Sequence, residues 1–79
     1  MDRKTQLEQE LKRIVDLICR EYKPEQVILF GSLAQGQVHD WSDIDLAVVK
    51  ETPERLIDRI GSILQLTRPR AGLNVIVYT

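Results

Sequence analysis

The spacing of apolar residues predicts an amphipathic α-helix over residues 5–22. Its apolar side chains recur at helical intervals and would form one stripe: Leu7, Leu11, Ile14, Val15, Ile18 and Tyr22. Thr5, followed three residues later by Glu8, has the form of a capping box at the start of this helix. Pro24 prevents the helix from continuing, so we expect it to run for about five turns.

Three short apolar runs predict the strands of a β-sheet, over residues 27–30, 44–49 and 73–78. The first run is continuous from Val27 to Phe30, which is typical of a strand covered on both faces, and the second has a similar composition. Residues 31–42 combine two glycines with polar residues. They predict one helical turn from Ser32 and then an irregular loop.

A second helix is predicted over residues 53–66. Thr52 can cap its free N–H groups, and Pro53 at the first helical position loses no hydrogen bond. Gly61 costs about 1 kcal/mol relative to Ala within this helix. Its apolar stripe would contain Leu56, Ile57, Ile60, Ile63 and Leu64. The order α-β-(turn)-β-α-β predicts one α/β domain over residues 1–79, with two helices covering one face of a three-stranded sheet.

Composition places the chain among reduced, soluble proteins. It contains 11 Lys and Arg against 12 Asp and Glu, so its net charge of −1 argues against a nucleic-acid binder that works through a broad basic face. A single cysteine cannot form a disulfide within the chain, and the sequence has no apolar stretch of the length that a signal peptide or a membrane span needs. The expected location is the cytoplasm, without membrane association.

Candidate chemistry lies where the first two predicted strands meet the loop between them. Asp43 and Asp45 are two residues apart at the start of a strand, so both carboxylates should project from one face while Ile44 packs under the other. Such a pair is unfavourable without cations, and hard oxygen ligands suit Mg²⁺ or Mn²⁺. Gly31 lets the backbone approach a ligand closely, and Ser32 offers a hydroxyl and N–H groups to a phosphate. The plainer interpretation is a turn-capping Asp and an ordinary strand-to-turn glycine.

Two segments resemble the signature of the polymerase β-type nucleotidyltransferase superfamily, in particular its minimal nucleotidyltransferase (MNT) branch. They are residues 31–36, Gly-Ser-Leu-Ala-Gln-Gly, and residues 42–46, Ser-Asp-Ile-Asp-Leu. The two-part motif is specific, whereas a lone Asp-x-Asp would be weak. The resemblance covers nearly the whole chain. It implies the nucleotidyltransferase fold, an α-β-α-β-α-β core with a small mixed three-stranded sheet packed on two helices.

The resemblance also implies an activity. Gly31 and Ser32 would bind nucleotide phosphates, and Asp43 and Asp45 would be the catalytic residues that ligate Mg²⁺ or Mn²⁺. The family transfers a nucleoside monophosphate from an NTP, here expected to be ATP, to an acceptor hydroxyl and releases pyrophosphate. Small stand-alone members resemble antitoxins that pair with a helical HEPN-domain toxin, and some adenylylate a tyrosine on that partner.

Two positions depart from the family pattern. The position matching its third carboxylate is Asn74, which is either a weakened metal ligand or a plain polar residue on a strand. No Asp or Glu follows Asp58, and an amide cannot accept a proton from an attacking hydroxyl. Gln35 stands where many minimal members carry an arginine, so a phosphate-facing charge is missing.

Two functions therefore stay open. The chain is either an enzyme that adenylylates a partner protein or a catalytically weakened binding module that acts on a partner by contact. Both predict a partner, a helical HEPN-like protein or a second copy of the chain, because 79 residues leave little protein to form an acceptor pocket. A further alternative is that these residues are a piece of a longer protein.

Overall fold

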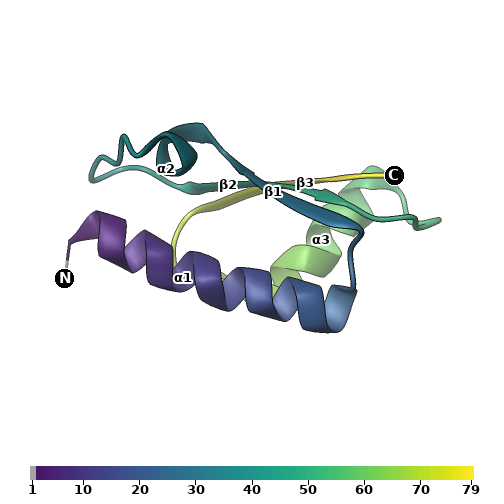
Figure 1. Cartoon of the computed structure of the whole chain (residues 1–79). Coiled ribbons are helices and arrows are strands. Elements are labelled where there is room, and N and C mark those ends of the chain that lie inside the picture. Colours follow the sequence, from purple (N-terminus) through teal and green to yellow (C-terminus); the bar gives the residue numbers. More distant parts are fainter. Residues whose placement is uncertain (1) are drawn as a thin grey trace.

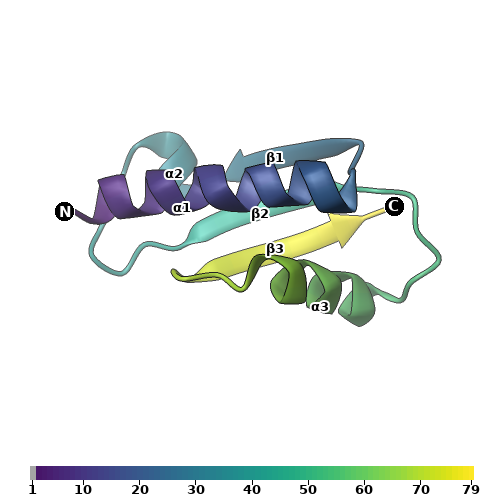
Figure 2. The same cartoon turned by 90° about the horizontal axis from the view of Figure 1, so that it is seen from below.

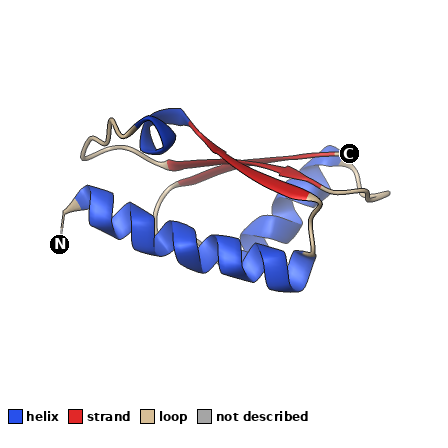
Figure 3. Ribbon diagram, viewed as in Figure 1, coloured by secondary structure: helices blue, strands red, loops and turns tan. Residues whose placement is uncertain are grey.

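The computed structural model describes residues 2–79. Its elements follow the predicted order (Figures 1 and 3). The helical segments are α1 (Arg3–Leu17), the π-helical turn η1 (Ile18–Tyr22), the short α2 (Gly31–Gln35) and α3 (Leu56–Thr67). The strands are β1 (Gln26–Phe30), β2 (Ile44–Val49) and β3 (Leu73–Tyr78). The three strands and the helical turn at Ser32 confirm the prediction.

The strands form one mixed sheet in the order β1-β2-β3, in which β2 is antiparallel to β1 and parallel to β3. Helices α1 and α3 lie side by side under one face of this sheet (Figures 1 and 2). The chain is thus an α/β protein with a small mixed sheet packed on two helices, as its sequence predicts. None of the helices in residues 2–79 has the length and apolar character needed to span a bilayer.

The prediction that the strands are covered on both faces is wrong. Along β2, Ile44, Leu46 and Val48 are fully buried against the helices, while the residues between them are only partly buried. On β1, Ile28 and Phe30 point to the other face and are exposed. Within residues 2–79, α1 and α3 cover one face of the sheet, and the other face, on which Asp45 lies, is largely exposed.

The start of α1 differs from the predicted capping box. Asp2, not Thr5, is the N-cap, and its carboxylate accepts a hydrogen bond of 2.7 Å from the Thr5 backbone N–H. A carboxylate at this end also interacts favourably with the helix dipole. The helix therefore begins two residues earlier than predicted. At the far end, Lys23 adopts a left-handed conformation (φ 53°) directly before Pro24.

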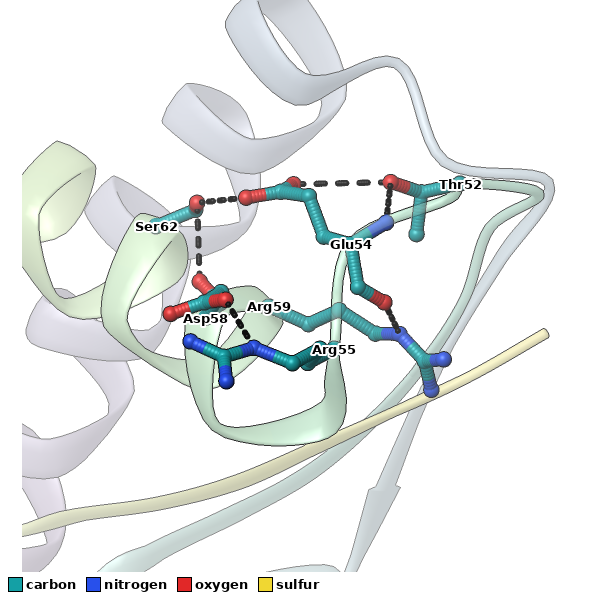
Figure 4. Close-up of polar contacts among 6 residues, drawn as sticks. All are labelled: Thr52, Glu54, Arg55, Asp58, Arg59 and Ser62. Carbon is teal, nitrogen blue, oxygen red and sulfur yellow. Dashed lines mark hydrogen bonds and ion pairs between the residues drawn. The ribbon is translucent and has the colours of Figure 1, made fainter.

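The start of α3 also differs from the prediction, and Figure 4 shows the polar contacts at this end of the helix. Thr52 is not the N-cap of this helix, so the prediction is wrong here: the Glu54 N–H donates to Thr52 Oγ1 at 3.2 Å, but this bond closes a turn before the helix. Arg55 is extended (ψ 158°) and is the N-cap, without a side-chain hydrogen bond, so the helix begins at Leu56 rather than Pro53. The Glu54 carboxylate accepts from Ser62 Oγ at 3.0 Å, and the Glu54 carbonyl accepts from Arg59 Nε at 2.8 Å. These bonds hold the turn against the first turns of α3.

A buried ion pair joins α1 to the loop before β3. The Glu10 side chain is 8% exposed and accepts two hydrogen bonds from the Arg13 guanidinium, at 2.7 and 2.8 Å. It also accepts from the backbone N–H of Arg70. The hydrogen bonds from Arg13 are the largest cause that lowers the pKa of Glu10 from 4.5 to about 2. Glu10 thus fixes the loop that leads into β3.

Glu10→Gln is expected to lower the free energy of unfolding at pH 7 by about 2 kcal/mol, because hydrogen bonds to charged groups are lost. Since the pKa of Glu10 is lowered from 4.5 to about 2 in the folded state, its stabilising contribution is present above pH 4.5 and disappears as the pH falls toward 2. Urea unfolding of the natural protein and of Glu10→Gln across this pH range tests the expected loss of the stability difference. Glu8→Gln, at an exposed position of α1, is the control with little expected effect. An unchanged difference at low pH would contradict the assignment.

Candidate active site

The site is built on the turn that follows β1. Gly31 has φ +78°, a conformation that side-chain-bearing residues rarely adopt. A Cβ atom at this position would lie 3.0 Å from Asp45 Cγ and closer still to Asp45 Oδ2. The glycine is therefore required by both its backbone conformation and its contact with the Asp45 carboxylate.

The turn leads directly into α2. No side chain caps this helix, whose N-cap residue is Phe30, and Ser32 in its first turn is partly buried. The helix ends at Gln35, its C-cap Gly36 has φ +75°, and the Gln37 N–H donates to the Ser32 carbonyl at 3.0 Å. Gln35 lies exposed at the end of α2. The Gly31–Ser32 turn is thus held between the end of β1 and the start of the loop to β2.

Asp45 is positioned from a second side by Asn74. The two residues are partners in the parallel β2–β3 register, and Phe30 is the partner of Asp45 on β1. Asn74 Nδ2 donates a hydrogen bond of 2.9 Å to Asp45 Oδ1. Asn74, which the sequence predicts to replace a third carboxylate, therefore contacts Asp45 with its N–H group directed at the carboxylate.

Asp43 precedes β2 and contacts a different pair of elements. Gly72 lies beside it, and a Cβ there would lie 2.5 Å from Asp43 Cγ. From the helix layer, Arg3 Nη2 lies 3.8 Å from Asp43 Oδ1. The Arg3 guanidinium also donates to the Ser42 carbonyl, through Nε at 3.1 Å and Nη2 at 2.7 Å. The first residue of α1 thus ties down the loop that carries Asp43.

The two aspartates lie at the same end of β2, with the buried Ile44 between them. Strand alternation predicts that both side chains lie on one side, but Asp43 precedes β2 and contacts Arg3 from the helix layer, whereas Asp45 contacts Gly31 and Asn74. Within residues 2–79, no three acidic, His or Cys side chains come together as a metal-binding cluster. The site therefore offers two carboxylates and one neutral amide, oxygen donors of the type that Mg²⁺ or Mn²⁺ prefers.

Sequence reasoning missed two residues that surround Asp43. Gly72 is part of a run, Arg68 to Gly72, whose composition indicates only a turn. Arg3 precedes the predicted start of the first helix and carries no local signal of its role. Both depend on the pairing of distant segments, since the β2–β3 register places Leu73 beside Ile44. No pattern within either segment could have identified them.

Comparison with known proteins agrees with this arrangement. The sequence model of the nucleotidyltransferase domain family matches residues 11–79. A crystal structure from Sulfolobus solfataricus, of a protein assigned as a nucleotidyltransferase, is similar with a TM-score of 0.75 and 27% identity. That similarity covers 95% of this chain and 68% of the other. No curated protein matches the sequence.

The family match includes the Gly31–Ser32 turn, both aspartates and all three strands. The solved structure extends the likeness over nearly the whole chain. This chain therefore belongs to the nucleotidyltransferase domain family and has the fold of a minimal nucleotidyltransferase.

Proposed function

We propose that this protein binds a nucleoside triphosphate, ATP, together with Mg²⁺ or Mn²⁺, and transfers the nucleoside monophosphate to an acceptor hydroxyl with release of pyrophosphate. Family membership supports nucleotidyl transfer in general. The observation that carries the specific proposal is the contact between Gly31 and the Asp45 carboxylate. It supports the proposal because the turn that we assign to the phosphates lies against one of the carboxylates that we assign to the divalent ion.

The turn and the carboxylates have separate tasks. Gly31 and Ser32 present backbone N–H groups and a hydroxyl to the phosphate tail. Asp43 and Asp45 supply the carboxylate oxygens that hold the divalent ion, and Asn74 and Gly31 fix the orientation of Asp45. The ion, when bound, offsets negative charge on the phosphates and on the leaving pyrophosphate. Without it, the triphosphate and two carboxylates repel one another.

The acceptor is proposed to be a hydroxyl on a partner protein in the cytoplasm, a helical HEPN-like protein that this chain adenylylates. A direct test is incubation with ATP labelled in its α-phosphate, Mg²⁺ and the product of the neighbouring gene. Label on the partner supports the proposal. If no label is transferred, and Asp43→Asn behaves like the natural protein, transfer to this partner is contradicted.

The contact between Asn74 and Asp45 favours a second candidate, a module that binds nucleotide and a partner with little turnover. General-base catalysis contributes about 10²–10⁴-fold, and an amide cannot supply it. Because the Asn74 N–H is directed at Asp45, it positions that carboxylate rather than adding another negative oxygen. The two candidates share the nucleotide site and differ in the rate of transfer.

Asn74→Asp is expected to raise the rate of label transfer by about 10²-fold or more, because it restores a group that can accept a proton. The measurement is single-turnover transfer with saturating Mg²⁺. If the natural chain gives no detectable transfer and the variant does, the binding-module function is supported. Transfer by the natural chain at a rate that the variant does not exceed would show that the site works with Asn74 as it stands. Thr79→Asp, outside the site, is the matched control for the added charge.

A further inference from the structure

Helix α3 carries more apolar side chains than the core of this protein uses. Of the five apolar residues predicted to face inward, only Ile63 is fully buried, where it packs in the core beneath the sheet. Ile57 is 74% exposed, Leu56 is 49% exposed and Leu64 is 38% exposed. The prediction of a single inward-facing stripe is therefore wrong, and a second apolar side of α3 is left uncovered.

This second side is continuous along the helix. We call it the lateral stripe: Ile57, Ile60, Gly61 and Leu64. Residues at these intervals of three and four lie on one side of a helix. None carries a charge, and Ile60 is only partly buried. Figure 2 shows α3 at the margin of the molecule under β3, with α1 on its other side, so a partner can reach α3 without displacing α1.

Gly61, in the middle of the stripe, has no explanation within the chain itself. Glycine inside a helix costs about 1 kcal/mol relative to alanine. Gly61 has no positive φ, and an added Cβ would find nothing within 4 Å. Neither its backbone conformation nor its surroundings therefore require it. A small residue at this place is explained if a second surface approaches closely there.

We propose that the lateral stripe is the contact surface of a homodimer, in which α3 packs antiparallel on the α3 of a second copy across a two-fold axis. The stripe is self-complementary in this orientation. Centred between residues 60 and 61, it places Ile60 opposite the partner subunit's Gly61 and Ile57 opposite the partner subunit's Leu64. A large residue then meets a small one at the centre, and no charge is buried.

A parallel pairing fits less well, because Ile60 would then oppose the partner subunit's Ile60, and two large side chains would hold the helices apart beside Gly61. The contact is small, since α3 has 12 residues and is about 18 Å long. Interfaces of this kind fall below the standard size and are weak. We therefore expect a dimer that dissociates at roughly micromolar concentrations.

Sedimentation velocity over a concentration series measures this association. The natural protein is expected to shift from monomer to dimer. Ile57→Asp should weaken dimerisation by about tenfold or more, because a charge is buried in an apolar contact. Ile28→Asp, the same change at an exposed apolar residue on the open sheet face, is the matched control and should leave the dimer intact.

Gly61→Ala gives a second test, because it should stabilise the monomer and weaken the dimer. In dilute, monomeric samples it should raise the melting temperature by about 4–8 °C, because helix propensity improves and the Cβ meets nothing. In the same variant the dimer should weaken, since the added methyl group keeps the two helices apart. A dimer unaffected by Gly61→Ala would contradict close approach at this residue.

A monomer at every concentration up to roughly 1 mM would overturn the proposal, as would a dimer that Ile28→Asp disrupts and Ile57→Asp does not. The proposal does not depend on nucleotide chemistry. Ile57 lies outside the candidate active site, so Ile57→Asp should bind nucleotide like the natural protein. Failure of dimerisation and failure of nucleotide binding are therefore distinguishable.

Discussion

Asp45→Asn is expected to weaken binding of ATP in the presence of Mg²⁺ by about 100-fold or more. The substitution removes the negative charge that we assign to the divalent ion, while it keeps the size of the side chain. The introduced amide would still present an oxygen to the N–H group of Asn74, which donates to Asp45 Oδ1 at 2.9 Å in the natural chain. The fold should therefore be retained while metal-dependent affinity is lost.

Fluorescence titration with a labelled ATP analogue measures this effect. Asp40→Asn is the matched control, because it makes the same change of charge at an exposed position of the loop before β2 and should bind as the natural protein does. Comparable affinity in Asp45→Asn and Asp40→Asn would contradict the assignment of Asp45 as a metal ligand.

Gly31→Ala is expected to abolish nucleotide binding and to destabilise the fold. The alanine would be strained at φ +78°, and its Cβ would collide with the Asp45 carboxylate. A residue held in such a conformation costs about 1–3 kcal/mol. The collision adds a displacement of Asp45, so both halves of the site are disturbed by one methyl group.

Gly36→Ala separates the effect of backbone strain from the effect of a collision with Asp45. Gly36 has φ +75°, close to that of Gly31, but an added Cβ there finds nothing within 4 Å. It should lower the melting temperature and leave nucleotide binding unchanged. If the two variants lose binding to the same degree, the contact between Gly31 and Asp45 is not what organises the site.

Much of the fold could be predicted because hydrophobic burial leaves a direct pattern in the sequence. The strands are apolar runs that match the structure closely, as β2 does at residues 44–49. The helix starts were harder, because they depend on single backbone angles. Thr52 makes a turn contact with Glu54 instead of the predicted helix cap, and the extended Arg55 delays the helix to Leu56. Composition also could not show that one face of the sheet stays largely exposed within residues 2–79.

The residues of the candidate site likewise include some that short sequence motifs indicate and others that only the packing of distant segments brings in. Gly31, Ser32, Asp43 and Asp45 lie in two short motifs, so local rules for turns and strands name them as candidates, and their roles stay predictions. Arg3 and Gly72 reach Asp43 only through the packing of α1 and the pairing of β3, which are distant in sequence. The direction of the Asn74 amide toward Asp45 likewise follows from the strand register.

Isothermal titration of the natural protein with ATP, with and without Mg²⁺, tests the central claim most directly. The claim is that the Gly31–Ser32 turn and the carboxylates of Asp43 and Asp45 form one site for a metal-bound nucleoside triphosphate. We predict saturable binding with Mg²⁺ that is lost when the ion is removed with a chelator. Absence of binding in both conditions, or binding that is indifferent to the ion, would contradict it.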